Sequence, residues 1–200
     1  MPTAEEITKH HEPAPGQNPW VNGPPAPAPI AVVDYDERWP GLFDVVARKI
    51  RAALGDAALA IEHVGSTSVK GLHAKPTIDV DLTVADPADE RAYVPALSSA
   101  GFTLVIREPE WHEHRCLQLA EPSSNVHVFG PDCPEVIRHR MFRQWLTEHP
   151  EDLELYRRAK LAAASAISAG SGMVMDYNKH KEPVIRAIYE RMFRASGLTR

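Results

Sequence analysis

Hydrophobic positions in the first two thirds of the chain follow two different spacings. Apolar residues recur every three or four positions from Trp39 to Leu54, with Pro40 near the start and Gly55 after the end, which predicts a helix. The segment 77–84, TIDVDLTV, alternates strictly between polar and apolar residues and predicts a strand with two unlike faces. Shorter apolar runs predict further strands at 30–35, 59–64, 102–106, 115–120 and 125–130.

The last third of the chain carries only helical spacing. Apolar stripes predict helices at about 134–148, 150–169 and 177–195, and one short helix is expected around 95–100, between two strands. Strands and helices are therefore mixed in the first part, and helices alone follow. This order predicts an α/β (α+β) fold: a mixed sheet flanked by helices, with a helical C-terminal part at about 134–200.

The first 29 residues differ in composition from the rest. They contain eight of the 18 prolines and few aliphatic residues. A segment of this kind buries too little apolar surface to offset the entropy lost on ordering. We therefore expect a Pro-rich flexible tail at 1–29 and one domain at 30–200.

Overall composition is that of a globular protein. The 200 residues are 44% hydrophobic and 24% charged, with a formal net charge of -5. The negative net charge argues against a nucleic acid as the partner. No apolar run reaches the length of a membrane span. With two cysteines and no basic-then-apolar start, we expect a cytoplasmic protein without a membrane partner.

Two aspartates lie on one face of the strand predicted at 77–84. Residues i and i+2 of a strand point the same way, about 7 Å apart, so Asp79 and Asp81 share a face. Two adjacent carboxylates repel each other unless a cation or solvent compensates their charge. Oxygen ligands at this spacing suit Mg²⁺ or Mn²⁺ together with a substrate phosphate. The alternative is the solvated polar face of an edge strand.

A Gly-Ser-Thr-Ser loop precedes this strand by about a dozen residues. Gly65 permits a tight turn after the strand at 59–64, and Ser66, Thr67 and Ser68 offer backbone N–H groups and hydroxyls at the start of a short helix, expected at about 68–72. Such a loop is suited to binding phosphate, although a Ser/Thr-rich helix cap has the same composition. A loop of this kind beside a carboxylate pair favours metal-assisted phosphate chemistry.

Several segments carry a family resemblance. The order of strand, Gly-Ser, short helix and strand with Asp-x-Asp resembles the nucleotidyltransferase-fold superfamily, the DNA polymerase β-like group. The segments YDERWPGLF, IEHVGSTSVKGLHAKPTIDVDLTV, REPEW, NVHVF, FRQWLTEHPED, LYRRAK and DYNKHKEPVI together look like the GrpB family over roughly residues 31–193. This resemblance implies a nucleotidyltransferase-like α/β domain with a helical C-terminal part.

The resemblance also implies roles for individual residues. It places Gly65 and Ser66 at the phosphate-binding Gly-Ser of the superfamily, and Asp79 and Asp81 at its two metal-binding carboxylates. Active members add a third carboxylate from a neighbouring strand. Here the corresponding strand, NVHVF, offers no Asp or Glu. His127 of that strand is a candidate general base or nitrogen ligand, and Glu62, before the loop, is a further candidate metal ligand.

Basic residues near these segments are candidates for binding a triphosphate, since charge on the phosphates needs several cations to stabilise it. We select Lys75, Arg115 and Lys181. The leading hypothesis is a Mg²⁺- or Mn²⁺-dependent nucleotidyltransferase that moves an NMP from an NTP substrate to a small-molecule acceptor. The alternative is a non-catalytic nucleotide- or CoA-binding module, or a folding accessory, with a degenerate site.

Overall fold

A mixed five-stranded sheet lies at the centre of the fold, in the strand order β1-β2-β5-β4-β3. β2 and β5 pair in parallel, and all other neighbouring strands pair antiparallel. The computed structural model describes residues 1–11, 16–26, 31–168 and 174–200. The strands are β1 (Ala60–Val64), β2 (Ile78–Thr83), β3 (Thr103–Glu108), β4 (His114–Leu119) and β5 (Ser124–Phe129).

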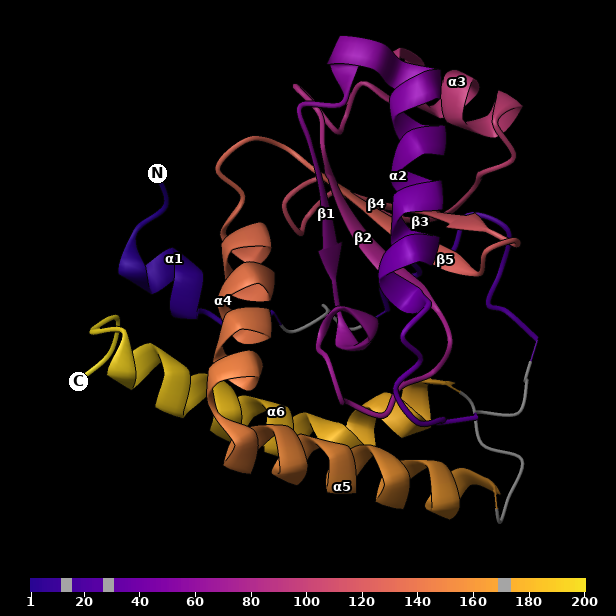
Figure 1. Cartoon of the computed structure of the whole chain (residues 1–200). Helices are drawn as coiled ribbons and strands as arrows, with labels where there is room; N and C mark the ends of the chain where they lie inside the picture. The colour runs from indigo at the N-terminus through magenta and orange to yellow at the C-terminus, as the bar shows by residue number, and fades with distance from the viewer. Residues whose placement is uncertain (12–15, 27–30, 169–173) are drawn as a thin grey trace.

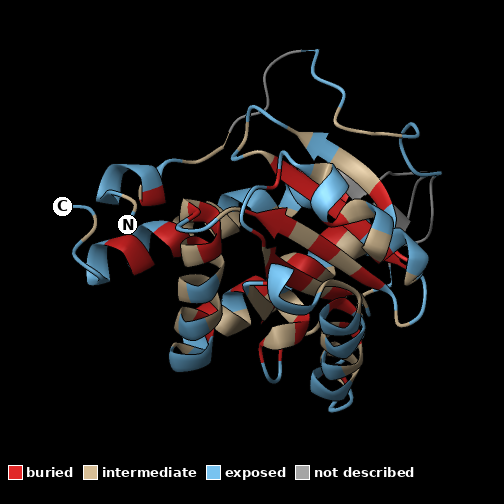
Figure 2. Ribbon diagram, turned by 90° about the horizontal axis from the view of Figure 1, so that it is seen from above, coloured by how far each residue is buried: buried red, intermediate tan, exposed pale blue. Residues whose placement is uncertain are grey.

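Two helices cover the apolar face of the sheet. α2 (Trp39–Leu54) lies along the strands and α3 (Val94–Ser99) lies near one end of the sheet (Figure 1). The strict alternation of β2 places Val80 and Leu82 on this face, where both are fully buried beneath α2 residues such as Val46. Burial is concentrated on the strands and on the inward sides of the helices (Figure 2). The hydrophobic core therefore lies on one side of β2, and its polar positions point to the other side.

Three helices form the C-terminal part. They are α4 (Pro134–Glu148), α5 (Pro150–Ser168) and α6 (Val174–Ala195), close to the bounds expected from their apolar spacing. α4 stands beside β1, and α5 and α6 pack side by side across one end of the sheet (Figure 1). Leu146, Tyr156 and Ile188, one from each helix, are buried in a shared cluster.

The strand expected at 30–35 is absent from the described residues. Of that segment only Val33 pairs, through mutual hydrogen bonds of 2.9 and 3.0 Å with Ala74. The chain then turns at Asp36, whose carboxylate accepts a hydrogen bond from the backbone N–H of Arg38 at 2.9 Å, just before α2 begins. Val33 therefore pairs with the connection between β1 and β2, and not with a strand of the sheet.

The described part of residues 1–29 differs from the expected flexible tail. A short helix, α1 (Ala4–Thr8), carries a capping box between Thr3 and Glu6. Its Ile7 is 8% exposed and packs against the C-terminal end of α6. Further along, Val21 donates a backbone hydrogen bond of 3.0 Å to Val105 at the outer edge of β3. The segments around Ile7 and Val21 are therefore both attached to the domain.

Candidate functional site

Asp79 and Asp81 lie on the polar face of β2, opposite the hydrophobic core. In register they pair with Asn125 and His127 of β5, whose side chains share this face. Asn125 donates a hydrogen bond of 2.9 Å from Nδ2 to Asp79 Oδ1. Burial alone would raise the pKa of Asp79, but His127 and Asn125 lower it by more, so it stays below its ordinary value. With 30% of its side chain exposed, Asp79 remains accessible.

Asp81 is more deeply placed, with a side chain only 1% exposed. Its Oδ2 accepts a hydrogen bond of 2.9 Å from Nδ1 of His139, on α4. Its Oδ1 is buried and has no hydrogen-bond partner in the described residues. A buried carboxylate oxygen without a partner costs stability, so this atom is suited to accept a cation or a hydrogen-bond donor that enters the site.

His139 links Asp81 to a second carboxylate. Its Nε2 lies 3.4 Å from Oε1 of Glu135, one turn earlier in α4. Burial lowers the pKa of His139, but the negative charges of Asp81 and Glu135 outweigh that effect and raise it to about 10. His139 is therefore an imidazolium at neutral pH and already compensates part of the charge of Asp81.

The turn after β1 brings Gly65 directly against Asp79. Gly65 has φ 66° and ψ -168°, a conformation that only glycine adopts readily. A Cβ at this position would lie 2.8 Å from Cβ and 3.0 Å from Cγ of Asp79, and closer still to Oδ2. Residue 65 is therefore a glycine for two separate reasons, and the loop backbone touches the carboxylate.

The residues after Gly65 form a single 3-10 turn, Ser66–Ser68, in place of the short helix expected at about 68–72. Ser68 Oγ donates to the carbonyl of Gly65 at 2.6 Å. The hydroxyl of Thr67 is turned inward, 3.0 Å from Nε2 of the buried His63. Ser66, next to Gly65, lines a cavity.

That cavity has a volume of about 160 Å³ and lies between the loop and the C-terminal helices. It is smaller than the roughly 300–1,000 Å³ of typical ligand pockets, so it matches one or two phosphate groups better than a whole nucleotide. Its lining combines the loop, the imidazolium and apolar side chains: Gly65, Ser66, Val69, His139, Phe142, Arg143, Leu146, Tyr156, Ile185 and Tyr189.

Glu62 and His127 differ in their relation to the acidic pair. Glu62 pairs with Asp81 in register, but its carboxylate accepts two hydrogen bonds, of 2.6 and 3.0 Å, from Arg140 of α4. His127 Nε2 lies 4.0 Å from Asp79 Oδ1. The structure thus brings His127 to the aspartates, whereas the carboxylate of Glu62 is held by a cation of its own.

A group of lysines surrounds the buried ring of Tyr177. Nζ of Lys75 and of Lys181 lie 5.4 and 4.8 Å from the centre of that ring. Burial, together with the charge of Lys181, lowers the pKa of Lys75, while Asp79 acts in the opposite direction. Lys160 of α5 is only 2% exposed, and its burial lowers its pKa well below the ordinary value. The charges of Lys181 and Lys75 lower that pKa further, and the charge of Asp79 opposes them. Cationic groups therefore gather near Asp79.

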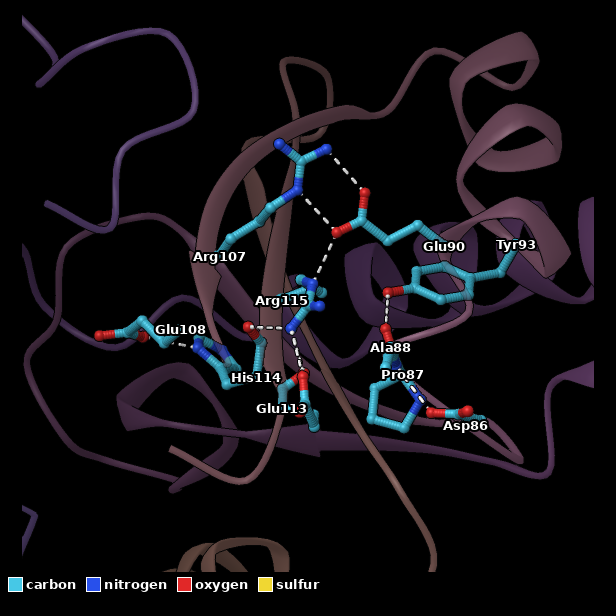
Figure 3. Close-up of polar contacts among 10 residues, drawn as sticks. All are labelled: Asp86, Pro87, Ala88, Glu90, Tyr93, Arg107, Glu108, Glu113, His114 and Arg115. Carbon is cyan, nitrogen blue, oxygen red and sulfur yellow. Dashed lines mark hydrogen bonds and ion pairs between the residues drawn. The ribbon is translucent and has the colours of Figure 1, made fainter. Parts of the chain in front are cut away.

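Arg115 lies elsewhere. Because Arg115 pairs with Val128, its side chain emerges on the core face of the sheet, away from the acidic pair. There its Nε donates to Glu90 Oε1 at 2.7 Å, and Arg107 shares the same carboxylate (Figure 3). The structure does not bring Arg115 together with the other candidate residues.

Two residues near the acidic pair, His139 and Lys160, are absent from the set predicted from sequence. The weak signal for His139 is Glu135 four positions earlier, a spacing that places both on one face of a helix. Lys160 carries no local signal, because only the packing of α5 makes it buried. Within the described ranges, no group of three or more His, Cys, Asp or Glu side chains is arranged to hold a metal ion. None of the described helices is long and apolar enough to cross a membrane.

Comparison with known proteins places this chain in a defined family. A family model described as GrpB protein matches residues 29–191. A UPF0157 protein of Halalkalibacterium halodurans is 44% identical over 167 residues, which cover 84% of each chain. A UPF0157 protein of Streptomyces coelicolor is 37% identical, covering 86% of this chain and 88% of its own.

A more distant relative has a different name. A dephospho-CoA kinase of Mycolicibacterium paratuberculosis is 29% identical over 83% of this chain, which matches 46% of that protein. Among solved structures, the crystal structure of conserved protein GrpB from Enterococcus faecalis superimposes with a TM-score of 0.73 at 25% identity, covering 83% of this chain and 99% of that chain. The expected fold class, a mixed sheet flanked by helices, is confirmed.

Proposed function

The chain belongs to the GrpB family, and we propose that it is a nucleotidyltransferase that moves an NMP from an NTP to a small-molecule acceptor with the help of Mg²⁺ or Mn²⁺. The observation that carries this proposal is the position of Asp79, beside Asp81 on β2, against a tight Gly-Ser loop and close enough to Lys75 and Lys160 to interact with their charges. Nucleotidyl transfer requires these elements close together, because its substrate is a polyphosphate whose charge must be compensated.

The acidic pair fits a divalent cation as a partial site. Asp81 Oδ1 is buried and has no hydrogen-bond partner among the residues that the structure describes, and Asp79 is accessible, so each can supply one oxygen ligand. Mg²⁺ is usually bound by one or two carboxylates, and phosphate oxygens and water fill its remaining coordination positions. When bound, the ion would neutralise charge on the phosphates.

The lysines supply the second part of the proposed site. Lys75 and Lys160 are each repelled by the charge of Lys181, and burial lowers the pKa of both. A polyphosphate entering between them would relieve both costs at once, since each ammonium would gain an anionic partner. The Ser66 hydroxyl and the loop backbone would bind phosphate oxygens from the side of the cavity.

The alternative is a non-catalytic module that binds a nucleotide or CoA, or acts as a folding accessory, with a degenerate site. Two contacts favour it: Glu62 is already paired with Arg140, and His139 already holds Asp81. Because Arg140 binds Glu62, that carboxylate is not free to act as the third one, and His139 already compensates part of the charge of Asp81. A protein named dephospho-CoA kinase contains a region similar to this chain, and that likeness supports a CoA-related role. The matching region is 46% of that protein.

The test is turnover. Purified protein is incubated with each α-labelled NTP, Mg²⁺ or Mn²⁺ and a small-molecule extract as the source of acceptor, and both pyrophosphate release and label transfer are followed. The proposal predicts both, with loss in Asp79→Asn and retention in the control Asp56→Asn, an exposed position in the turn Gly55–Ala57. Nucleotide or CoA binding without transfer, unaffected by metal or by Asp79→Asn, would support the non-catalytic module instead.

A further inference from the structure

A row of polar side chains crosses three neighbouring strands toward Asp79. Glu108 Oε2 lies 2.7 Å from Nδ1 of His114, and Nε2 of His114 lies 3.1 Å from Nδ1 of His127. Nε2 of His127 then faces Asp79 Oδ1 at 4.0 Å. The first of these contacts, between β3 and β4, is drawn in Figure 3. Glu108 and His114 have no part in the site described so far.

With Glu108 ionised and His114 neutral, the hydrogens in this row have one consistent arrangement. A carboxylate accepts hydrogen bonds and has none to donate, so Nδ1 of His114 must donate to Glu108. His114 is 3% exposed, and burial lowers its pKa to about 4, so it is neutral and carries a single ring hydrogen. Its Nε2 is then an acceptor, and Nδ1 of His127 must be the donor in the 3.1 Å contact.

The arrangement determines which atom His127 presents to the acidic pair. With its hydrogen on Nδ1, neutral His127 has a bare lone pair on Nε2. That lone pair faces Asp79 Oδ1 across 4.0 Å. Only when the ring takes up a second hydrogen, on Nε2, does it act as a positive charge that lowers the pKa of Asp79. Two acceptors facing each other leave room for a group that brings its own hydrogen, such as a hydroxyl.

Packing holds the row in place. The ring of Phe129 stacks on His114 with centres 4.9 Å apart, and Trp111 contacts it edge-on, also at 4.9 Å. These aromatic contacts prevent the imidazole from rotating away from Glu108. A fixed His114 in turn fixes the orientation of His127.

We propose that Glu108 and His114 are positioning residues, which lock His127 in the tautomer whose Nε2 accepts the proton of the acceptor hydroxyl. The inference rests on the proposed nucleotidyl transfer. As the hydroxyl oxygen bonds to the α-phosphorus, its proton passes to His127 Nε2, the bond from the α-phosphorus to the bridging oxygen breaks, and pyrophosphate leaves with that electron pair. The imidazolium then returns its proton to solvent. Asp79, beside Nε2, stabilises the imidazolium while it exists.

The first experiment needs no substrate. Ring-nitrogen NMR spectra of ¹⁵N-histidine-labelled full-length protein, recorded with a chelator at about pH 8.5, two units above an ordinary imidazole pKa, report which nitrogen carries hydrogen. Signals are assigned with His114→Gln and His127→Gln. We expect both histidines to carry hydrogen on Nδ1 in the wild type. Hydrogen on Nε2 of His127 would overturn the proposal.

A variant then tests the origin of the preference. Glu108→Ala removes the acceptor, so the opposite tautomer of His127 should appear, whereas Glu110→Ala, an exposed glutamate of the same turn, should leave the spectrum unchanged. If the tautomer of His127 were unchanged in Glu108→Ala, Glu108 would have no positioning role. In the transfer assay, Glu108→Ala should lower kcat by on the order of 10- to 100-fold, the usual range for loss of a group that orients a histidine, with a smaller effect on KM.

The two proposals fail in different ways. If the wild type shows the expected tautomers but no NTP supports transfer, the proposed function is wrong and the hydrogen-bond arrangement stands. If transfer occurs and Glu108→Ala keeps full kcat, the function stands and the positioning role is wrong.

Discussion

Gly65→Ala is the substitution for which the structure gives the largest local consequence. Residue 65 has a positive φ and extended ψ, and an added Cβ would lie 2.8 Å from Cβ of Asp79, with Oδ2 nearer still. The obstacle is the root of a side chain on a central strand, which cannot move aside without moving β2. Alanine must therefore both strain the loop and displace the carboxylate.

The magnitude has two parts. Holding alanine in this region of backbone space costs about 1–3 kcal/mol, and the steric overlap adds about 1–3 kcal/mol. We expect the free energy of unfolding to fall by about 2–6 kcal/mol, measured by urea denaturation followed by circular dichroism. An unchanged slope of the transition would show that the loss reflects stability alone.

Two further glycines separate the contributions. Gly71 also has positive φ (82°), but a Cβ there meets nothing within 4 Å, so Gly71→Ala should show only the backbone cost. Gly41, in the first turn of α2, has open space and no positive φ, so Gly41→Ala should be neutral or stabilising by about 0.5–1 kcal/mol. If Gly65→Ala cost no more than Gly71→Ala, the close approach of the loop to Asp79 would be refuted.

Two other substitutions test the charges around the site. Burial lowers the pKa of His63 to about 4, below the roughly 6.5 of an unfolded chain, so the unfolded state takes up the proton first. Stability should therefore decrease as pH falls from about 6.5 to 4. Urea denaturation across that pH range should show a smaller decrease for His63→Gln than for the wild type. An equal decrease in both proteins would contradict the lowered pKa of His63. Lys160→Met removes a buried amino group whose pKa burial lowers well below its ordinary value, and should leave the free energy of unfolding unchanged or higher. Triphosphate binding, measured by calorimetry, should weaken; clear destabilisation with unchanged binding would show that Lys160 is structural.

The part of the site that the sequence predicts lies within one short stretch of chain. Strict alternation over 77–84 determines which side of β2 is buried, so the shared face of Asp79 and Asp81 follows from the spacing alone. The contact between Gly65 and Asp79 is also close in sequence, because the connection 65–77 returns the chain antiparallel along β1.

The remainder depends on how separate elements pack. Arg115 was expected near the phosphates, but the register of β4 against β5 places it opposite Val128 and hence on the core face. A shift of one residue would have reversed that placement. His139 reaches Asp81 from a helix 58 positions along the chain, and no local periodicity indicates such a contact.

Metal-dependent nucleotide binding tests the central claim most directly, because it requires no acceptor. Calorimetric titration with an NTP analogue that cannot be cleaved at the α-phosphorus is carried out with Mg²⁺ and with a chelator, on the wild type, Asp79→Asn and the control Asp56→Asn. We predict binding that requires Mg²⁺, is retained in Asp56→Asn and weakens by about tenfold or more, equivalent to about 1.4 kcal/mol, in Asp79→Asn. Binding of equal strength in the chelator and in Asp79→Asn would contradict it.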